Sequence, residues 1–523
     1  MRRMMNLMIA VVMATAIHVA AMAQTDTAKL NGNDSLDSSS REAFLSRTME
    51  HVDLWKQISY ERNGNPAVQS DRYATGLSQI QVYWQRTGLD KPIVLQEGSG
   101  RTIYGAEAST FMPLGKRNTI WGAASYQAGK KNDIRWCETS DYALLYPYVL
   151  ADTLGGEMQN ERYAFNGGCA TRLGQFVIGE ELDFRAEHEY RSTDPRPRGI
   201  VTDMTLRLGV AYVLPEYTVG VAVGGRFYKQ TNDVDFYKES GVIAEYQMTG
   251  LGSDYKRFRG ANRDAYYKST GWIASVNLMP KGKQGCFVDT ELSDLPVQRI
   301  LTTLNSMPIS KLYVTRMTSR MGWKDESERM GWRAFAGADL QWRQGDELIA
   351  GSSSSTEYDE IGHLTMYKNR LTDLYLGFAM RTGLKNRLTA ECQLGYQDYW
   401  SRYVYPERKF SFDKIYGSLR SQLLIPFDRW LIATSLSASY FKNTNDKTVM
   451  PYGLMDSNNR YMVDYLTASS AADFVTCDLG FRADYQPKGW GGYALFGRLD
   501  AGLVHSTYSD NAATVRLALG LTF

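Results

Sequence analysis

The closing stretch RLALGLTF, residues 516–523, decides the fold class. Successive side chains of a β-strand point to opposite faces of a sheet, so residues two positions apart share a face. One face here is wholly apolar, and with the preceding residue it consists of Val515, Leu517, Leu519, Leu521 and Phe523. The other face carries arginine, alanine, glycine and threonine. The pattern predicts a β-strand with one apolar face along its whole length.

The same alternation recurs along the chain. It is clearest in residues 205–214, 218–229, 372–381, 473–485 and 493–503. Strands of soluble sheets typically have about 5 or 6 residues, whereas a tilted strand needs about 9 to 11 residues to cross a bilayer. These stretches match the second length. We therefore expect an all-β protein, a transmembrane antiparallel up-and-down β-barrel whose apolar faces contact outer-membrane lipid.

Short and long connections alternate between the expected strands. Short connections with a proline occur at Pro113, Pro215, Pro280, Pro426 and Pro487. Long connections that are polar and carry tyrosine are expected at residues 130–160, 231–263, 345–369 and 443–471. Outer-membrane barrels place short turns in the periplasm and long loops outside the cell. Counting strands between the turns predicts about 18 strands, with 14 or 16 as alternatives.

The amino-terminal residues predict export. Two arginines precede an apolar run over about residues 4–19, and an A-x-A site follows at residues 21–23. This layout is typical of a cleaved secretory signal peptide, and we expect the mature protein to reach the outer membrane. The expected organisation is a signal peptide at 1–23, a periplasmic segment at 24–70 and a barrel at 71–523.

Composition and motifs argue against several functions. The chain has 59 basic and 57 acidic residues, a balance that gives no basis for a nucleic-acid partner. Its five cysteines lie far apart without a CxxC pair, and neither an HExxH spacing nor a G-x-S-x-G motif occurs, so we predict no metal site, cofactor or catalytic residues. An outer-membrane hydrolase that uses His188 or His505 as a base beside Asp183 or Asp510 is the least favoured function.

The final strand resembles the assembly signal of outer-membrane β-barrel proteins. The residues that carry the resemblance are Val515, Leu517, Leu519, Leu521 and Phe523. In that family the barrel-insertion machinery of the membrane recognises the signal. The resemblance therefore implies this machinery as a partner during biogenesis.

Residues opposite the apolar faces predict a charged lumen. The acids are Glu181, Asp183, Glu187, Asp373, Glu391, Asp478, Asp484 and Asp500. The bases are Arg185, Arg207, Arg226, Arg381, Arg420, Arg482, Arg498 and Arg516. Arginine pairs with carboxylates through two parallel hydrogen bonds, so this choice favours a cross-linked wall over a selectivity filter, which normally has rings of one sign. The densest cluster is expected at Arg482, Asp484, Arg498, Asp500 and Arg516.

The segment before the barrel predicts a small hatch. Apolar residues recur at roughly helical spacing at Phe44, Leu45, Met49, Val52, Trp55 and Ile58. We expect this helix to lie in the periplasmic mouth of the barrel. Asn65, Pro66 and Ala67 follow, and they resemble the Asn-Pro-Ala that precedes the barrel in FadL-like long-chain fatty acid transporters; a turn with the same residues is the alternative.

Three classes of function remain. The first is a channel or passive transporter for a small solute or hydrophobic ligand. The second is a surface protein that docks a lipoprotein, a glycan or a neighbouring barrel through Trp136, Tyr142, Tyr146 and Tyr148, because tyrosine offers contact area at low entropic cost. An ordered insert at 130–160 would favour this second class, and an open lumen the first. The third is the hydrolase. Through its YPYVLAD loop the chain is also similar to an outer-membrane barrel family without an assigned function.

Overall fold

The computed structural model describes residues 33–237, 245–259, 264–327, 329–353, 358–383 and 385–523. The predicted signal peptide and residues 24–32 lie outside these ranges. Among the described residues, no helix is both long enough and apolar enough to cross a membrane.

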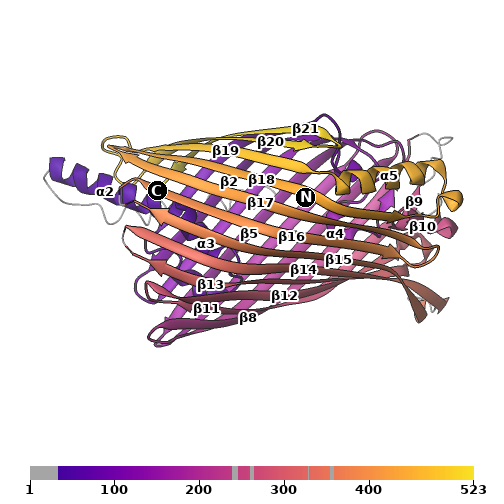
Figure 1. Cartoon of the computed structure of the whole chain (residues 1–523), viewed down its shortest axis with the longest axis horizontal. Helices are drawn as coiled ribbons and strands as arrows, with labels where there is room; N and C mark the ends of the chain where they lie inside the picture. The colour runs from indigo at the N-terminus through magenta and orange to yellow at the C-terminus, as the bar shows by residue number, and fades with distance from the viewer. Residues whose placement is uncertain (1–32, 238–244, 260–263, 328, 354–357, 384) are drawn as a thin grey trace.

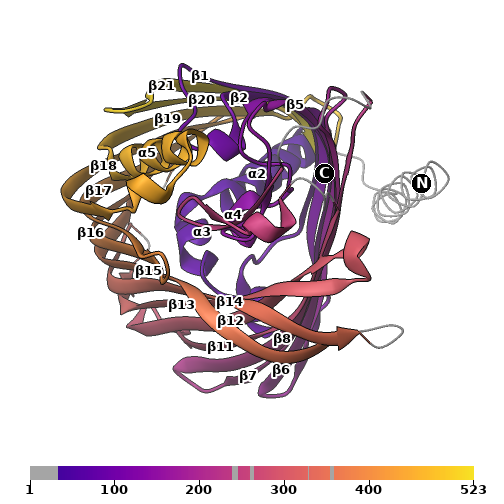
Figure 2. The same cartoon turned by 90° about the vertical axis from the view of Figure 1, so that its right-hand side faces the viewer.

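Eighteen antiparallel strands of the described residues form one closed sheet (Figures 1 and 2). They are β1 (Leu77–Leu89), β2 (Gly100–Leu114), β3 (Asn118–Ile134), β5 (Gly156–Leu173), β6 (Phe176–Tyr190), β7 (Arg196–Val213), β8 (Tyr217–Asp235), β11 (Ala265–Pro280), β12 (Gln284–Leu301), β13 (Met307–Glu326), β14 (Met330–Ser353), β15 (Tyr358–Thr382), β16 (Arg387–Tyr403), β17 (Arg408–Phe427), β18 (Trp430–Val449), β19 (Phe474–Tyr485), β20 (Ala494–Ser506) and β21 (Asp510–Thr522). The predicted barrel of about 18 strands is confirmed.

The stretch RLALGLTF closes this barrel. It belongs to β21, which pairs with β1 in an antiparallel register from Gln79 opposite Thr522 to Leu89 opposite Ala512. Ser78 and Phe523 exchange two backbone hydrogen bonds of 2.9 Å at the end of the seam. Leu519 is 69% exposed on the outer face, whereas its neighbour Ala518 is buried. The alternation read from the sequence is therefore the alternation between the outer face and the lumen.

The two ends of the barrel differ, as the sequence predicts. At one end, which we call the turn end, connections are short, for example from Leu173 to Phe176 and from Phe427 to Trp430. The other end, the loop end, carries the long connections. The prediction of a loop at 345–369 is wrong, because β14 and β15 run through most of this range as an extended hairpin. Polar residues on both faces hide the alternation there, since this part of the hairpin needs no apolar face.

Short helices and a second, small sheet lie at the two ends. At the turn end are α2 (Asn33–Val52), α3 (Leu54–Tyr60) and η1 (Pro66–Asp71). At the loop end are η2 (Leu95–Glu97), α4 (Tyr142–Leu145), β4 (Leu150–Ala151), β9 (Tyr246–Gly250), β10 (Ser253–Asp254), η3 (Lys256–Phe258), η4 (Thr302–Leu304), η5 (Tyr452–Leu454) and α5 (Ser457–Ala471). Viewed along the barrel, α3, α4 and α5 lie within the ring of strands (Figure 2).

Candidate functional site

Helix α3 is anchored to the wall at the turn end through a tryptophan. Asp53 caps the helix by accepting a hydrogen bond of 2.9 Å from the backbone N–H of Trp55. The Trp55 side chain is 1% exposed and packs on Phe287 and Phe335 of the wall. Its indole N–H donates to Glu326 at 3.2 Å. The guanidinium of Arg333 lies 4.4 Å from the indole ring, a cation–π contact that attaches α3 to β14.

Three hydrogen-bonded ion pairs join the α3 region to the wall. The Arg62 guanidinium makes a bidentate pair with Asp339 of β14. Arg420 of β17 donates two hydrogen bonds, of 2.8 and 3.0 Å, to Glu61. Asp53 pairs with Arg387 at 3.3 Å. The contacts reach β14, β16 and β17, so α3 spans part of the mouth rather than lying along one strand.

The Asn65-Pro66-Ala67 motif fits against glycines of the wall. Asn65 is fully buried and its side chain caps η1 by accepting from the N–H of Ala67 at 2.9 Å. A Cβ atom added at Gly209 would collide with the Asn65 side chain, and one added at Gly179 would collide with the backbone of Pro66 and Ala67. These glycines let the motif approach β6 and β7 closely. We call residues 65–67 and the facing glycines the joint.

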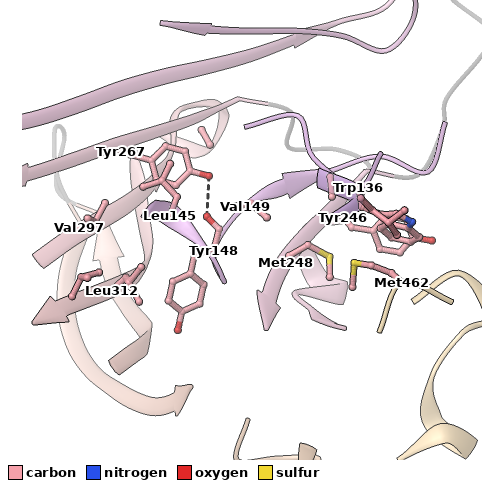
Figure 3. Packing of buried hydrophobic residues seen from close by; sticks show 14 of the residues in the cluster. Trp136, Leu145, Tyr148, Val149, Tyr246, Met248, Tyr267, Val297, Leu312 and Met462 are labelled. Carbon is pink, nitrogen blue, oxygen red and sulfur yellow. Dashed lines mark hydrogen bonds between the residues drawn. The ribbon is translucent and has the colours of Figure 1, made fainter. Parts of the chain in front are cut away.

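An inward-folded insert, residues 135–155, lies inside the loop end. Tyr148 is 2% exposed, and its carbonyl accepts a hydrogen bond of 3.1 Å from the hydroxyl of Tyr267 on β11 (Figure 3). Arg343 of β14 donates to the carbonyls of Ala143 and Tyr146, both at 2.7 Å. These bonds satisfy carbonyl groups in α4 and just after it, and they attach the insert to β11 and β14.

The remaining loops pack onto this insert. Strands β4, β9 and β10 form a three-stranded sheet. The ring of Trp136 lies 5.4 Å from the ring of Tyr246 on β9. Met462 of α5 packs in the same cluster as Met248 of β9 (Figure 3). One continuous apolar cluster drawn from four connections, that of Leu95 included, thus lies at the loop end.

A buried group of charges lies at the base of the insert. Arg191 donates to Asp152 at 2.6 Å and lies 3.6 Å from Glu138. Glu138 is 1% exposed. Burial, together with the nearby carboxylates Asp152 and Glu245, raises the pKa of Glu138 well above its ordinary value, although Arg191 opposes the shift.

The insert is expected to lose stability as the pH rises. A carboxyl whose pKa is raised on folding contributes stability that is present at low pH and is lost as the pH rises through the folded pKa. Hydrogen exchange of residues 136–152, corrected for intrinsic exchange, should therefore show less protection at alkaline pH. Glu138→Gln should flatten this dependence, and the exposed Glu157→Gln should not. An equal pH dependence in both variants would contradict the role of Glu138.

Two adjoining cavities lie inside the barrel. One, of about 810 Å³, is lined partly by His51, Val52 and Leu54 at the turn end. The other, of about 780 Å³, extends along β5 to β8 and β11 to β13. They share Gln79, Ser109, Ala123 and Asn166 in their linings. More than half of the residues that line each cavity are charged or polar, which favours occupancy by water and polar solutes.

The chain matches a family of unknown function (DUF6850) over residues 66–523. It belongs to that family. The predicted similarity to an outer-membrane barrel family without an assigned function is confirmed. The matched range begins within the joint, at Pro66, and includes every strand of the barrel. No curated protein matches the chain.

Solved outer-membrane receptors have similar folds. The ferric enterobactin receptor of Pseudomonas aeruginosa (mutant R480A_Q482A) is 9% identical, over 86% of this chain and 81% of that chain, with a TM-score of 0.38. The ferric preacinetobactin receptor of Acinetobacter baumannii is 7% identical, over 86% and 80%, with a TM-score of 0.39. The outer membrane transporter YddB of Escherichia coli is 10% identical, over 85% and 81%, with a TM-score of 0.40. The likeness is one of barrel fold. The resemblance of the joint to FadL-like transporters stays a prediction.

Most of the charged side chains in the lumen of this barrel form ion pairs. The predicted cluster separates into three pairs: Arg482 with Asp484 at 2.8 Å, Arg498 with Asp500 at 2.8 Å, and Arg516 with Glu107 at 3.1 Å. Glu107 is missing from the predicted cluster because it lies on β2, which β1 separates from β21. Elsewhere the lumen pairs are Arg185–Glu187, Arg207–Asp183, Arg226–Asp203 and Arg420–Glu391.

The candidate residues for surface docking and for a hydrolase site contact other residues of the chain. Trp136 and Tyr148 are buried in the insert, while Tyr142 and Tyr146 are half-buried with rings 5.5 Å apart. The candidate acids Asp183 and Asp510 pair with Arg207 and Lys91 at 2.8 and 2.9 Å. His188 lies 3.2 Å from Arg198, and His505 lies 3.0 Å from Asn511.

Five residues of the proposed assembly signal share the outward parity of β21. Val515, Leu517 and Leu519 are exposed, and Leu521 and Phe523 are half-buried near the turn end. Recognition by the insertion machinery stays a prediction.

Proposed function

We propose that the protein is an outer-membrane transporter for a small polar solute, closed at rest by two segments of its own chain. The turn end faces the periplasm in this proposal, and the loop end faces outward. The observation that carries it is the placement of α3 across the mouth, where Trp55 and three ion pairs hold it below the two lumen cavities. Insertion into the membrane is expected to require the barrel-insertion machinery.

The ion pairs of α3 suit a gate because they are individually weak. The side chains of the Arg62–Asp339 pair are 24% and 33% exposed, and those of Arg420–Glu61 are 31% and 42% exposed. Such partly solvated pairs contribute about 0 to 1 kcal/mol each. The joint, in contrast, is fully buried at Asn65. We infer that α3 can leave the wall while the joint stays in place and acts as the pivot.

The lumen favours a polar solute over a hydrophobic ligand. Paired arginines and carboxylates line both cavities, including Arg207 with Asp183 and Arg498 with Asp500. Because these charges are largely neutralised by each other, we expect little selectivity for the sign of a small ion. A hydrophobic ligand would have to displace water from these groups without replacing its hydrogen bonds.

Single-channel conductance tests the proposal with four proteins. They are the mature chain, a chain without residues 24–62, a chain in which residues 137–152 are replaced by a short Gly-Ser linker, and a chain with both changes. Removing one closure leaves the other in place, so a large steady conductance is expected only in the double variant. Equal conductance in all four would contradict closure at rest. A folded double variant that stays silent would contradict transport.

A surface interaction protein is the second candidate. The β14–β15 hairpin is far longer than the about 9 to 11 residues that cross a bilayer. Exposed apolar side chains occur along the loop end, including Ile361 at 70% and Tyr405 at 79% exposed. These residues, rather than the buried Trp136 and Tyr148, would contact a lipoprotein, a glycan or a neighbouring barrel. A folded double variant that shows no conductance would favour this second function.

A further inference from the structure

We propose that the turn end holds a binding site for a phosphate group, between α3 and the inner wall of β13, β14 and β15. A cavity of about 410 Å³ lies there, beneath Trp55 and separate from the two lumen cavities. Seven cationic side chains line it: Lys56, Arg62, Lys281, Arg320, Lys324, Arg333 and Arg381. The carboxylates in the lining are Asp71, Asp289 and Glu326.

The arginines of the wall are buried and incompletely bonded. Arg320 and Arg333 are 4% and 7% exposed, and the Nε atom of each is buried without a hydrogen-bond partner among the described residues. The closest carboxylate oxygen to Arg320 belongs to Glu61, at 3.9 Å, and its guanidinium lies 4.5 Å from the Phe335 ring. Arg381 is half-buried, lies 5.5 Å from the Trp55 ring and forms no ion pair with any described residue. Buried charges of this kind are costly unless an anion compensates them.

The carboxylates present supply only part of that compensation, because the lining holds three of them against seven cationic side chains. Glu326 is already shared, since it accepts from Trp55 and Arg333 and lies 3.5 Å from Lys324. Asp289 accepts a hydrogen bond of 3.0 Å from the Asn277 side chain. Glu61 lies 3.9 Å from Arg320, but seven cationic side chains face only three carboxylates in the lining, so a net positive charge remains for a ligand.

The geometry points to a phosphate group rather than a halide. Arginine presents a planar fork of N–H donors that matches the oxygens of phosphate in pairs. Arg320, Arg333 and Arg381 come from three neighbouring strands, so they can approach one anion from several directions. The cavity is many times larger than the about 30 Å³ that one water occupies. Phe287 and Phe335 provide an apolar wall for a small organic substituent.

A bound phosphate would connect the α3 region to the wall. Lys56 and Arg62 belong to the α3 region, whereas Arg320 and Lys324 belong to β13. An anion between them adds an attraction that exists only while α3 is in place, so binding should stabilise the closed state in proportion to ligand saturation. The site does not depend on transport, because binding is measured on the closed protein.

Thermal unfolding and calorimetry of the full mature chain in detergent test the site. Sodium phosphate should give saturable binding and a higher unfolding temperature, and sodium chloride at equal ionic strength should not. Arg320→Gln should weaken binding by about ten- to hundredfold, as for loss of a charged hydrogen bond. Arg381→Gln should weaken binding by a similar factor, so the site can still be tested if Arg320→Gln does not fold. Arg370→Gln on β15, whose side chain is 51% exposed and pairs with Asp398, is the matched control.

Nanodiscs with and without phosphatidylglycerol distinguish the source of the phosphate. Binding of inorganic phosphate that the variants weaken would identify a soluble ligand. Stabilisation by phosphatidylglycerol alone, again weakened by the variants, would identify a lipid headgroup at the rim. Absence of both effects would overturn the site, as would phosphate binding that both variants retain in full.

Discussion

Replacing Trp55 by alanine is expected to free α3 from the wall. The substitution removes a side chain that is 1% exposed, a hydrogen bond of 3.2 Å to Glu326 and a stacking contact with Arg333. Truncating a buried tryptophan costs about 3 to 5 kcal/mol, and each 1.4 kcal/mol changes an equilibrium about tenfold. The population with α3 released should therefore rise about a hundredfold or more. The barrel itself should stay folded, because its strand ladders are untouched.

A buried reporter measures this release. Ile58 of α3 is 4% exposed, so Ile58→Cys, in a chain whose native cysteines are replaced by alanine, should react with a maleimide reagent only when α3 leaves the wall. Trp55→Ala should raise the labelling rate about a hundredfold or more. Trp342→Ala, which removes a 39% exposed indole from the outer face of β14, is the control. Equal labelling rates in the two variants would show that Trp55 does not hold α3 against the wall.

The barrel could be predicted because lipid imposes a rule on every strand. Outward residues must be apolar wherever the wall meets lipid, so a period of two appears in stretches such as 218–229 and 516–523. Where the wall extends beyond the membrane the rule lapses. For this reason the hairpin of β14 and β15 was expected as a loop at 345–369.

The closures could be predicted only in part. The helical spacing that includes Trp55 indicates a hatch, but its partners Glu326 and Arg333 lie far away in the sequence and carry no matching pattern. The insert was harder to predict, since a tyrosine-bearing polar loop suits exposure as well as burial. What buries Tyr148 is a set of donors on remote strands, Tyr267 and Arg343 among them, which satisfy the insert backbone.

Substitution of Gly179 by valine is expected to break the joint. A Cβ atom there would collide with the backbone of Pro66 and Ala67, which cannot move aside as a flexible side chain would. Since Ala67 and Val68 pack against Ala170 and Val177 of the wall, displacing them should also expose this apolar contact. We expect the whole segment before β1 to detach, and not α3 alone.

Two reporters separate loss of the joint from release of α3. Val68 is 3% exposed in the joint region and Ile58 is 4% exposed in α3. Gly179→Val should raise the labelling of both Val68→Cys and Ile58→Cys, whereas Trp55→Ala should raise only the second. Gly417→Ala is the control, because a Cβ at that position meets only Leu394 at an ordinary 3.5 Å. If Gly179→Val leaves Val68→Cys protected, the joint does not depend on this glycine. If both variants label both reporters equally, the segment moves as one body, and the joint is not a pivot.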